Sequence, residues 1–323
     1  MRYWRHATKA TFADVNEQGQ TMTATPAPRS KLVSWFWATR PLSLSASIAP
    51  VLVGTALAAT VGALDWLLFA LALTGSVAIQ IGTNLTDEYS DHRKSGSEGK
   101  FLAPHKVIQR GLLSERAVAL GMAAAFGYGV AAGLIIVAHV GWPILAVGLA
   151  SVAVAYLYAG GPRPLGTLGL GEPVVFVFMG PLMVMASYYV QQETFTWASF
   201  YVSLPVAFIV TAILVVNNIR DVEEDREAGK RSLATAAGAR VATWAYAALL
   251  AAAYLSIAGA ALGGAVSAWA LLGLTPLPWA VGAARGLFAA GERPAMNRLL
   301  VRSGKLHGLT GLALAAGLYA SSL

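Results

Sequence analysis

The chain has 323 residues and no cysteine, which excludes disulfide bonds, thiol nucleophiles and cysteine-bound metal clusters. Charged residues are also scarce: they account for 12% of the chain, whereas hydrophobic residues account for 56%. A chain this apolar does not fit an ordinary soluble domain. Acids are scarcer than bases, with 16 Asp and Glu against 23 Lys and Arg. The sequence is therefore that of a membrane protein, and each acidic residue in it calls for a structural or functional explanation.

Long uncharged stretches are frequent, and a stretch of about 20 apolar residues is long enough to cross a bilayer as a helix. Nine such stretches are present: 42–62, 66–86, 117–138, 142–160, 173–190, 200–219, 241–262, 266–284 and 306–322. We therefore predict an all-α, polytopic membrane protein with nine transmembrane helices.

The basic residues test this count, because short cytoplasmic loops collect Lys and Arg. All 23 fall in the N-terminal segment or in the loops after the second, fourth, sixth and eighth stretches. This pattern predicts a cytoplasmic N-terminus and nine spans in the cell (inner) membrane. The net charge of +7 is explained by this topology and by anionic lipid, so the lipid bilayer, and not nucleic acid, is the expected partner.

The chain begins with a polar segment, residues 1–34, that contains no apparent cleavable signal peptide. We expect this segment to be cytoplasmic and loosely ordered. Residues 35–323 then form one membrane domain.

Two copies of the pattern Asn-x-x-Asp-x-x-x-Asp hold four of the six aspartates. Their members are Asn84, Asp87 and Asp91 in the first copy, and Asn218, Asp221 and Asp225 in the second. At about 100° per residue of helix, these positions fall within an arc of about 60°. Each copy stands where a hydrophobic stretch meets a basic loop. Two such stripes facing each other would form a divalent-cation site on the cytoplasmic side.

The residue types indicate the chemistry. Hard carboxylate oxygens favour Mg²⁺ or Ca²⁺, and Mg²⁺ fills most of its coordination positions with water and phosphate oxygens. Both motifs are followed by cations, so the pattern favours a clamp for a diphosphate. A diphosphate held in this way is a good leaving group, and an apolar bundle would shield an allylic carbocation from water until an aromatic ring attacked it.

Three segments carry a resemblance to a known family: residues 217–234, which read NNIRDVEEDREAGKRSLA, residues 158–166, which read YAGGPRPLG, and the pair Arg40 and Pro41. They resemble the UbiA superfamily of membrane prenyltransferases, and within it the branch that prenylates 1,4-dihydroxy-2-naphthoate in menaquinone biosynthesis. The resemblance extends from about Trp35 to the end of the ninth predicted span. It implies a nine-helix bundle with a central cavity, Mg²⁺, a polyprenyl diphosphate donor and an acceptor that loses CO₂.

The resemblance also implies roles for individual residues. Asp221 and Asp225 match the family's second metal-binding motif. The first motif departs from the family pattern, because Asn84 stands where a carboxylate is usual. The naphthoate branch commonly carries Asn there, which leaves Asn84, Asp87 and Glu88 open as direct ligands.

Candidate residues fall into three groups. Metal-binding and catalytic roles are assigned to Asp87, Asp91, Asp221 and Asp225, with Asn84, Asn218 and Glu88 as further metal ligands. Diphosphate contact is assigned to Arg93, Lys94, Lys230, Arg231 and Arg163. Acceptor contact is assigned to Tyr158, Arg40, Lys106 and Gln109. The alternative for the acids is simple ion pairing at helix ends, and for the cations it is membrane topology.

Two other functions remain open at this stage. One is prenylation of another aromatic acceptor, such as 4-hydroxybenzoate or a chlorin, although the Tyr-x-x-x-Lys signature of the 4-hydroxybenzoate enzymes is absent. The other is an ion-coupled transporter, which predicts carboxylates near the middle of the bilayer.

Overall fold

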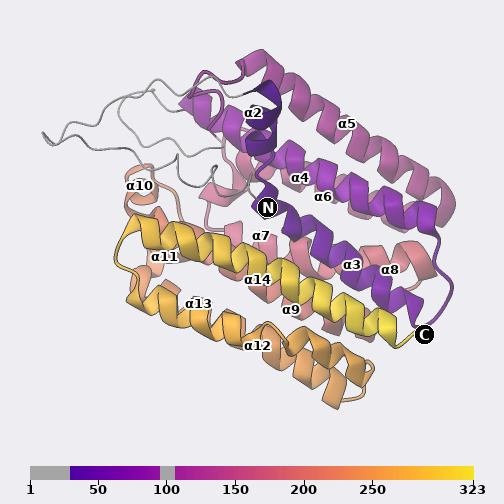
Figure 1. Cartoon of the computed structure of the whole chain (residues 1–323). Helices are drawn as coiled ribbons and strands as arrows, with labels where there is room; N and C mark the ends of the chain where they lie inside the picture. Colours follow the sequence, from indigo (N-terminus) through magenta and orange to yellow (C-terminus); the bar gives the residue numbers. More distant parts are fainter. Residues whose placement is uncertain (1–29, 95–105) are drawn as a thin grey trace, which may run out of the picture.

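Helices account for almost all of the regular structure in the computed structural model, which describes residues 30–94 and 106–323 (Figure 1). In this part of the chain, β structure is limited to one isolated bridge between Leu168 and Arg231. The elements are α2 (Lys31–Ala38), η1 (Pro41–Leu44), α3 (Ser45–Ala59), α4 (Trp66–Lys94), α5 (Glu115–Val140), α6 (Trp142–Ala159), η2 (Leu165–Thr167), α7 (Gly171–Val177), η3 (Phe178–Leu182), α8 (Met183–Gln192), α9 (Trp197–Arg220), α10 (Val222–Glu227), α11 (Leu233–Ala237), α12 (Ala239–Leu262), η4 (Ala268–Leu274), α13 (Leu277–Ala289) and α14 (Arg293–Ala320). The predicted all-α class is confirmed.

Seven helical segments within the described ranges are long and apolar enough to cross a membrane. They correspond to the first seven predicted spans. Two of the segments combine several elements: one consists of η1 and α3, and the other consists of α7, η3 and α8. The eighth predicted span is divided between η4 and α13, because Pro276 and Pro278 interrupt the helix there. The ninth lies within α14, whose first half carries several cations. The protein is an integral membrane protein, and the count of nine spans stays a prediction.

The predicted boundary between residues 34 and 35 stays a prediction. Helix α2 begins at Lys31, where the Ser30 side chain accepts a hydrogen bond from the Val33 amide at 3.4 Å. Residues 1–29 of the predicted polar segment lie outside the described residues.

Local sequence signals set several helix boundaries. The Ser114 hydroxyl accepts from the Ala117 amide at the start of α5, and Gly141, with φ of 86°, allows the tight turn from α5 into α6. Thr196 and Ser199 form a reciprocal capping box at the start of α9. These caps satisfy backbone groups that would be costly to leave unpaired near a bilayer.

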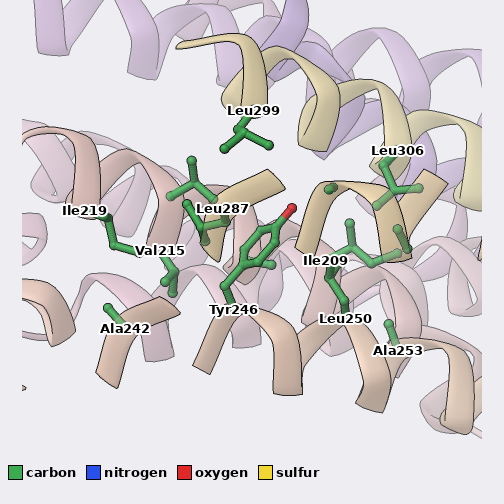
Figure 2. Packing of buried hydrophobic residues seen from close by; sticks show 14 of the residues in the cluster. Ile209, Val215, Ile219, Ala242, Tyr246, Leu250, Ala253, Leu287, Leu299 and Leu306 are labelled. Atoms are coloured by element: carbon green, nitrogen blue, oxygen red, sulfur yellow. The ribbon is translucent and has the colours of Figure 1, made fainter. Parts of the chain in front are cut away.

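The bundle packs around α3 and α9, which are the most buried of the candidate spans, whereas α5 and α6 are the least buried. One large apolar cluster joins α9, α12, α13 and α14, with Ile209, Leu250 and Leu306 among its members (Figure 2). Tyr246 crosses this cluster, and its hydroxyl meets the Ser303 hydroxyl at 2.8 Å. The buried Tyr246 hydroxyl therefore has a hydrogen-bond partner, and this hydrogen bond joins α12 to α14.

Several helix ends that carry polar residues meet at one end of this bundle (Figure 1). These are the C-terminal ends of α4, α6 and α9, the short helix α10, and the N-terminal ends of α7 and α14. Both aspartate motifs lie at this end. A cavity of about 300 Å³ lined by Leu57, Tyr188 and Leu318 lies at the opposite end and touches neither motif. The predicted central cavity is a separate feature and stays a prediction.

Close helix packing in η3 yields a first test. Gly180 lies against α9, where a Cβ atom added to it would be only 2.8 Å from the Ala207 Cα atom. Gly180→Ala is therefore expected to lower Tm by roughly 3–10 °C, because the backbone of α9 must move. Gly259→Ala in α12 is the matched control, since nothing lies within 4 Å of its added Cβ. Equal Tm values for the two variants, measured by thermal unfolding in detergent, would contradict this packing.

Candidate functional site

The first aspartate motif lies on the last turns of α4, a continuous helix of 29 residues. Asp87 forms an ion pair with Arg40, and Asp91 forms one with Lys106. Arg40 lies between α2 and η1 in a left-handed conformation with φ of 51°, which is uncommon outside glycine. Arg40 precedes α4 in the chain and Lys106 follows it, and the fold brings both cations to the carboxylates of α4.

Two buried residues on α4 hold those cations in place. The Asn84 side-chain amide donates to the Thr39 carbonyl and to the Ser43 hydroxyl, both at 2.9 Å, which fixes the turn that carries Arg40. The Glu88 carboxylate accepts from the Ile108 amide at 2.8 Å, which fixes the segment that carries Lys106. The other Glu88 oxygen accepts no hydrogen bond from the described residues and lies 3.9 Å from the Lys106 ammonium.

The second motif spans the junction between α9 and α10. Asp221 lies at this junction, where it accepts from Arg220 at 2.8 Å and from Arg293 of α14 at 2.9 Å. Asp225 accepts from the Lys230 ammonium at 2.8 Å, and the same ammonium donates to the Asn218 carboxamide oxygen at 3.1 Å. Lys230 therefore lies between two members of the motif.

Burial affects the ionisation of this motif. It raises the pKa of Asp225 above its usual value, whereas the hydrogen bond and positive charge of Lys230 lower that pKa. A second positive charge close to Asp225 would therefore favour the ionised carboxylate.

Sequence reasoning missed Glu172 on α7. Its carboxylate accepts from the Asn218 carboxamide at 2.9 Å and from the Leu233 amide at 3.0 Å, so it orients both the motif and the loop that follows it. A signal was available, because Glu172 is the only acid between Glu115 and Glu193, in a stretch that is otherwise strongly apolar.

Arg293 and Asn297 on α14 were also missed. Arg293 makes a forked contact with Glu224, at 2.5 and 3.1 Å, besides its bond to Asp221. The Asn297 carboxamide oxygen accepts from Arg220 at 3.3 Å. No local pattern predicts these contacts, because α14 is far from the motif in sequence.

Tyr158 lies half-buried on the last turn of α6, where α6 approaches both α4 and α7. Its hydroxyl faces the first turn of α7, at 3.6 Å from a Cβ atom added to Gly171. The end of α6 also lies beside α4, because a Cβ atom added to Gly160 would be 3.1 Å from the Thr86 side chain. The loop after α6 contacts the segment that follows the second motif, because the Arg231 amide donates to the Thr167 carbonyl at 2.9 Å.

Within the described residues, Arg93, Arg163 and Arg231 form no ion pair with an aspartate of either motif. Arg93 pairs with Glu115 at 3.5 Å and stacks over the Tyr89 ring. The side chains of Arg163 and Arg231 are exposed, and Gln109 is half-buried beside Ile108. The side chain of Lys94 lies outside the described residues.

The donor set fits magnesium that is held together with a phosphate ligand. In residues 30–94 and 106–323, no three acidic or histidine side chains converge to form a metal cage made of protein groups alone. Mg²⁺ does not need one, because one or two carboxylates and substrate phosphate oxygens usually suffice. The ligand atoms at this end are hard oxygens, and one buried Glu88 oxygen has no hydrogen-bond donor within the described part of the chain. The cations paired with the aspartates are of the type that binds phosphate.

The fold and the site together define an integral membrane protein with two carboxylate motifs and their counter-cations at one end of a helical bundle. Residues 47–309 match the UbiA prenyltransferase family, and the chain belongs to this family. It is a membrane prenyltransferase.

Curated relatives are similar over most of the chain. The 1,4-dihydroxy-2-naphthoate octaprenyltransferase of Bacillus subtilis (strain 168) is 35% identical over 262 residues, which cover 81% of this chain and 84% of the relative. The protein of the same name from Escherichia coli (strain K12) is 32% identical, with 90% and 97% covered. Among solved structures, a UbiA homolog from Archaeoglobus fulgidus bound to GPP and Mg²⁺ superposes with a TM-score of 0.63 at 15% identity. It covers 88% of this chain and 99% of its own, and it supports the fold.

Proposed function

We propose that this protein transfers a polyprenyl group from polyprenyl diphosphate to 1,4-dihydroxy-2-naphthoate, with loss of CO₂ and diphosphate, to give demethylmenaquinol, the reduced form of demethylmenaquinone. The observation that carries the proposal is the pair of aspartate motifs, each with a cation in contact, at one end of an apolar helical bundle. The choice of acceptor rests on the relatives, several of which are named for this substrate.

The proposed topology is nine spans in the cell (inner) membrane, with the N-terminus and the active site towards the cytoplasm. It is supported by the basic residues of 30–94 and 106–323, which cluster at the end of the bundle that holds both motifs. Asp87 lies about 30 Å along α4 from Trp66, which is close to the full hydrocarbon thickness. Carboxylates at a span end favour a transferase over a transporter, whose ion sites lie near the middle of the bilayer.

Asp87, Asp91, Asp221 and Asp225 would hold Mg²⁺, and the open oxygen of Glu88 and the carboxamides of Asn84 and Asn218 are further donors. Bound magnesium supplies positive charge that stabilises the departing diphosphate. The ion pairs then have a second role. Lys106 and Lys230 neutralise the aspartates before the substrate arrives, and the Lys230 ammonium is proposed to turn to the diphosphate oxygens when the substrate binds.

The bond changes in the proposed reaction balance. The bond between C1 of the prenyl chain and the diphosphate oxygen breaks, and its electron pair leaves with the diphosphate. The ring carbon that bears the carboxylate bonds to C1, and the electron pair of the carbon–carboxylate bond restores the aromatic ring as CO₂ departs. The apolar helices exclude water, which would otherwise capture the allylic cation.

Tyr158, Arg40 and Lys106 are proposed to contact the acceptor. Arg40 and Lys106 are ion-paired with the first motif, and the end of α6 that carries Tyr158 lies beside Thr86 of α4. Gln109 follows the segment fixed by Glu88 and is proposed to act with them. Arg93, Lys94, Arg163 and Arg231 are proposed to contact the diphosphate.

The test is a transfer assay with the purified full-length chain, one labelled polyprenyl diphosphate and a choice of acceptors. With 1,4-dihydroxy-2-naphthoate and Mg²⁺ we expect a product of the mass of the prenylated naphthol and one CO₂ per turnover, and neither product after removal of divalent ions with EDTA. Prenyl transfer to 4-hydroxybenzoate alone would overturn the proposal that 1,4-dihydroxy-2-naphthoate is the acceptor. Solute uptake driven by an ion gradient, without any prenyl transfer, would overturn the proposal that the protein is a transferase.

A further inference from the structure

The outward face of α14 carries a regular series of side chains that the prenyl-transfer site does not use. Its exposed members are Arg298, Val301, Arg302, Lys305, Leu309, Leu312 and Tyr319. At about 100° per residue, all of them fall within an arc of about 100° of the helix surface. The face is divided along its length, because the cations come first and the apolar residues follow.

A second helix contributes to the same surface. Helix α13 lies beside α14 (Figure 1). Arg302 packs against Gly282 of α13, and a Cβ atom added to Gly282 would be 3.2 Å from the guanidinium carbon. Arg285 lies one turn further along α13 and is exposed. Apolar side chains of α13, among them Trp279 and Val281, are exposed as well.

The cations on this surface have no protein counter-charge. Neither α13 nor α14 contains an acidic residue. Among the described residues, no carboxylate lies within 4.0 Å of Arg285, Arg298, Arg302 or Lys305. The cations beside the two aspartate motifs differ in this respect, because they are ion-paired.

The position of these cations along α14 places them at the proposed edge of the membrane. The ninth proposed span, residues 306–322, begins directly after Lys305, and α14 continues as one helix across this boundary. Arg298, Arg302 and Lys305 therefore lie on the turns just before the span, and Leu309 and Leu312 lie on the same face inside it. Cations at this boundary are at the level of the lipid headgroups, where a negative charge can meet them.

From these observations we infer that the outward face of α14, together with α13, binds an anionic phospholipid of the cytoplasmic leaflet. The phosphate of the headgroup accepts hydrogen bonds from Arg298, Arg302 and Lys305, and Arg285 borders the same position. The acyl chains lie along Leu309 and Leu312, directly below. Membrane topology alone does not account for this arrangement, because it requires cations near the end of the span and does not require them to share one face of the helix.

Lipid binding to the full-length chain tests the inference. The protein in detergent is titrated with phosphatidylglycerol and, separately, with phosphatidylcholine, and bound lipid is counted by native mass spectrometry. The triple variant Arg298→Gln, Arg302→Gln, Lys305→Gln is expected to bind phosphatidylglycerol about tenfold more weakly, with phosphatidylcholine unchanged. The matched control Arg116→Gln, Arg226→Gln, Arg240→Gln removes the same charge from exposed positions elsewhere and should stay within about twofold of the unmodified protein.

A second variant removes no charge. Gly282→Leu should displace the Arg302 guanidinium and weaken phosphatidylglycerol binding, provided that Tm is retained. Equal losses in the two triple variants would overturn the inference, because they would indicate only a diffuse attraction. Displacement of phosphatidylglycerol by soluble geranyl diphosphate at equal concentration would also overturn it, since the cations would then belong to the prenyl substrate. Because binding is measured without turnover, these outcomes do not depend on the proposed reaction.

Discussion

Asp221→Asn is expected to abolish prenyl transfer, with kcat at least about a hundredfold lower, while the protein still folds and inserts. The substitution removes the negative charge that this motif offers to a metal and keeps the shape of the side chain. The fold should survive because neither neighbouring cation is left without a partner. Arg220 keeps its contacts with Asn217 and Asn297, and Arg293 keeps Glu224.

The control for this variant is Glu223→Gln, two residues away. The Glu223 side chain is 78% exposed, and its ion pair is with Arg226, whose side chain is 54% exposed. It should keep kcat within about twofold of the unmodified protein, because an exposed ion pair contributes little. The measurement is the initial rate at saturating donor, acceptor and Mg²⁺, with Tm recorded for both variants. Near-normal turnover of Asp221→Asn would remove the support for a metal at this motif.

Lys230→Met is expected to impair both the reaction and the stability of the second motif. Its ammonium contacts Asp225 and Asn218, and the two ends of its ion pair are 22% and 15% exposed. Without it, the diphosphate loses a cation, so KM for the donor should rise by about tenfold or more. The Asp225 carboxylate also stays half-buried without its partner, which should lower Tm.

A conservative substitution separates the two roles of Lys230. Lys230→Arg keeps the charge and should restore Tm, with only partial recovery of KM because a guanidinium differs in shape from an ammonium. Arg226→Gln serves as the surface control and should change neither quantity. A normal KM for the donor in Lys230→Met, despite a lowered Tm, would limit Lys230 to a structural role.

Much of the site could be predicted from the sequence because the two motifs are local. Asn84, Asp87 and Asp91 share one face of α4 through helical periodicity alone, and Lys230 follows Asp225 closely enough to fold back on it. The contacts that sequence reasoning missed are long-range. Glu172 reaches Asn218 across 46 positions and Arg293 reaches Asp221 across 72, so no periodicity relates them.

The same distinction applies to the fold. The first seven predicted spans could be read from hydrophobicity, because a helix that crosses lipid must be apolar over its whole length. The stretch 266–284 was predicted as one span, whereas it is divided into η4 and α13. Hydrophobicity does not detect this break, because the prolines that cause it are themselves compatible with apolar surroundings.

The sequence by itself determined the helical class, the placement in a membrane, the family and the two carboxylate motifs, since each of these depends on composition or on spacing within one helix. Only the tertiary structure decided which cation meets which aspartate, that Glu172 and Arg293 hold the second motif, and that Arg298, Arg302 and Lys305 of α14 face outward with no ion pair to a carboxylate of the described residues. Those features depend on how separate helices pack, and packing is set by the combined shape of many side chains distant in the sequence.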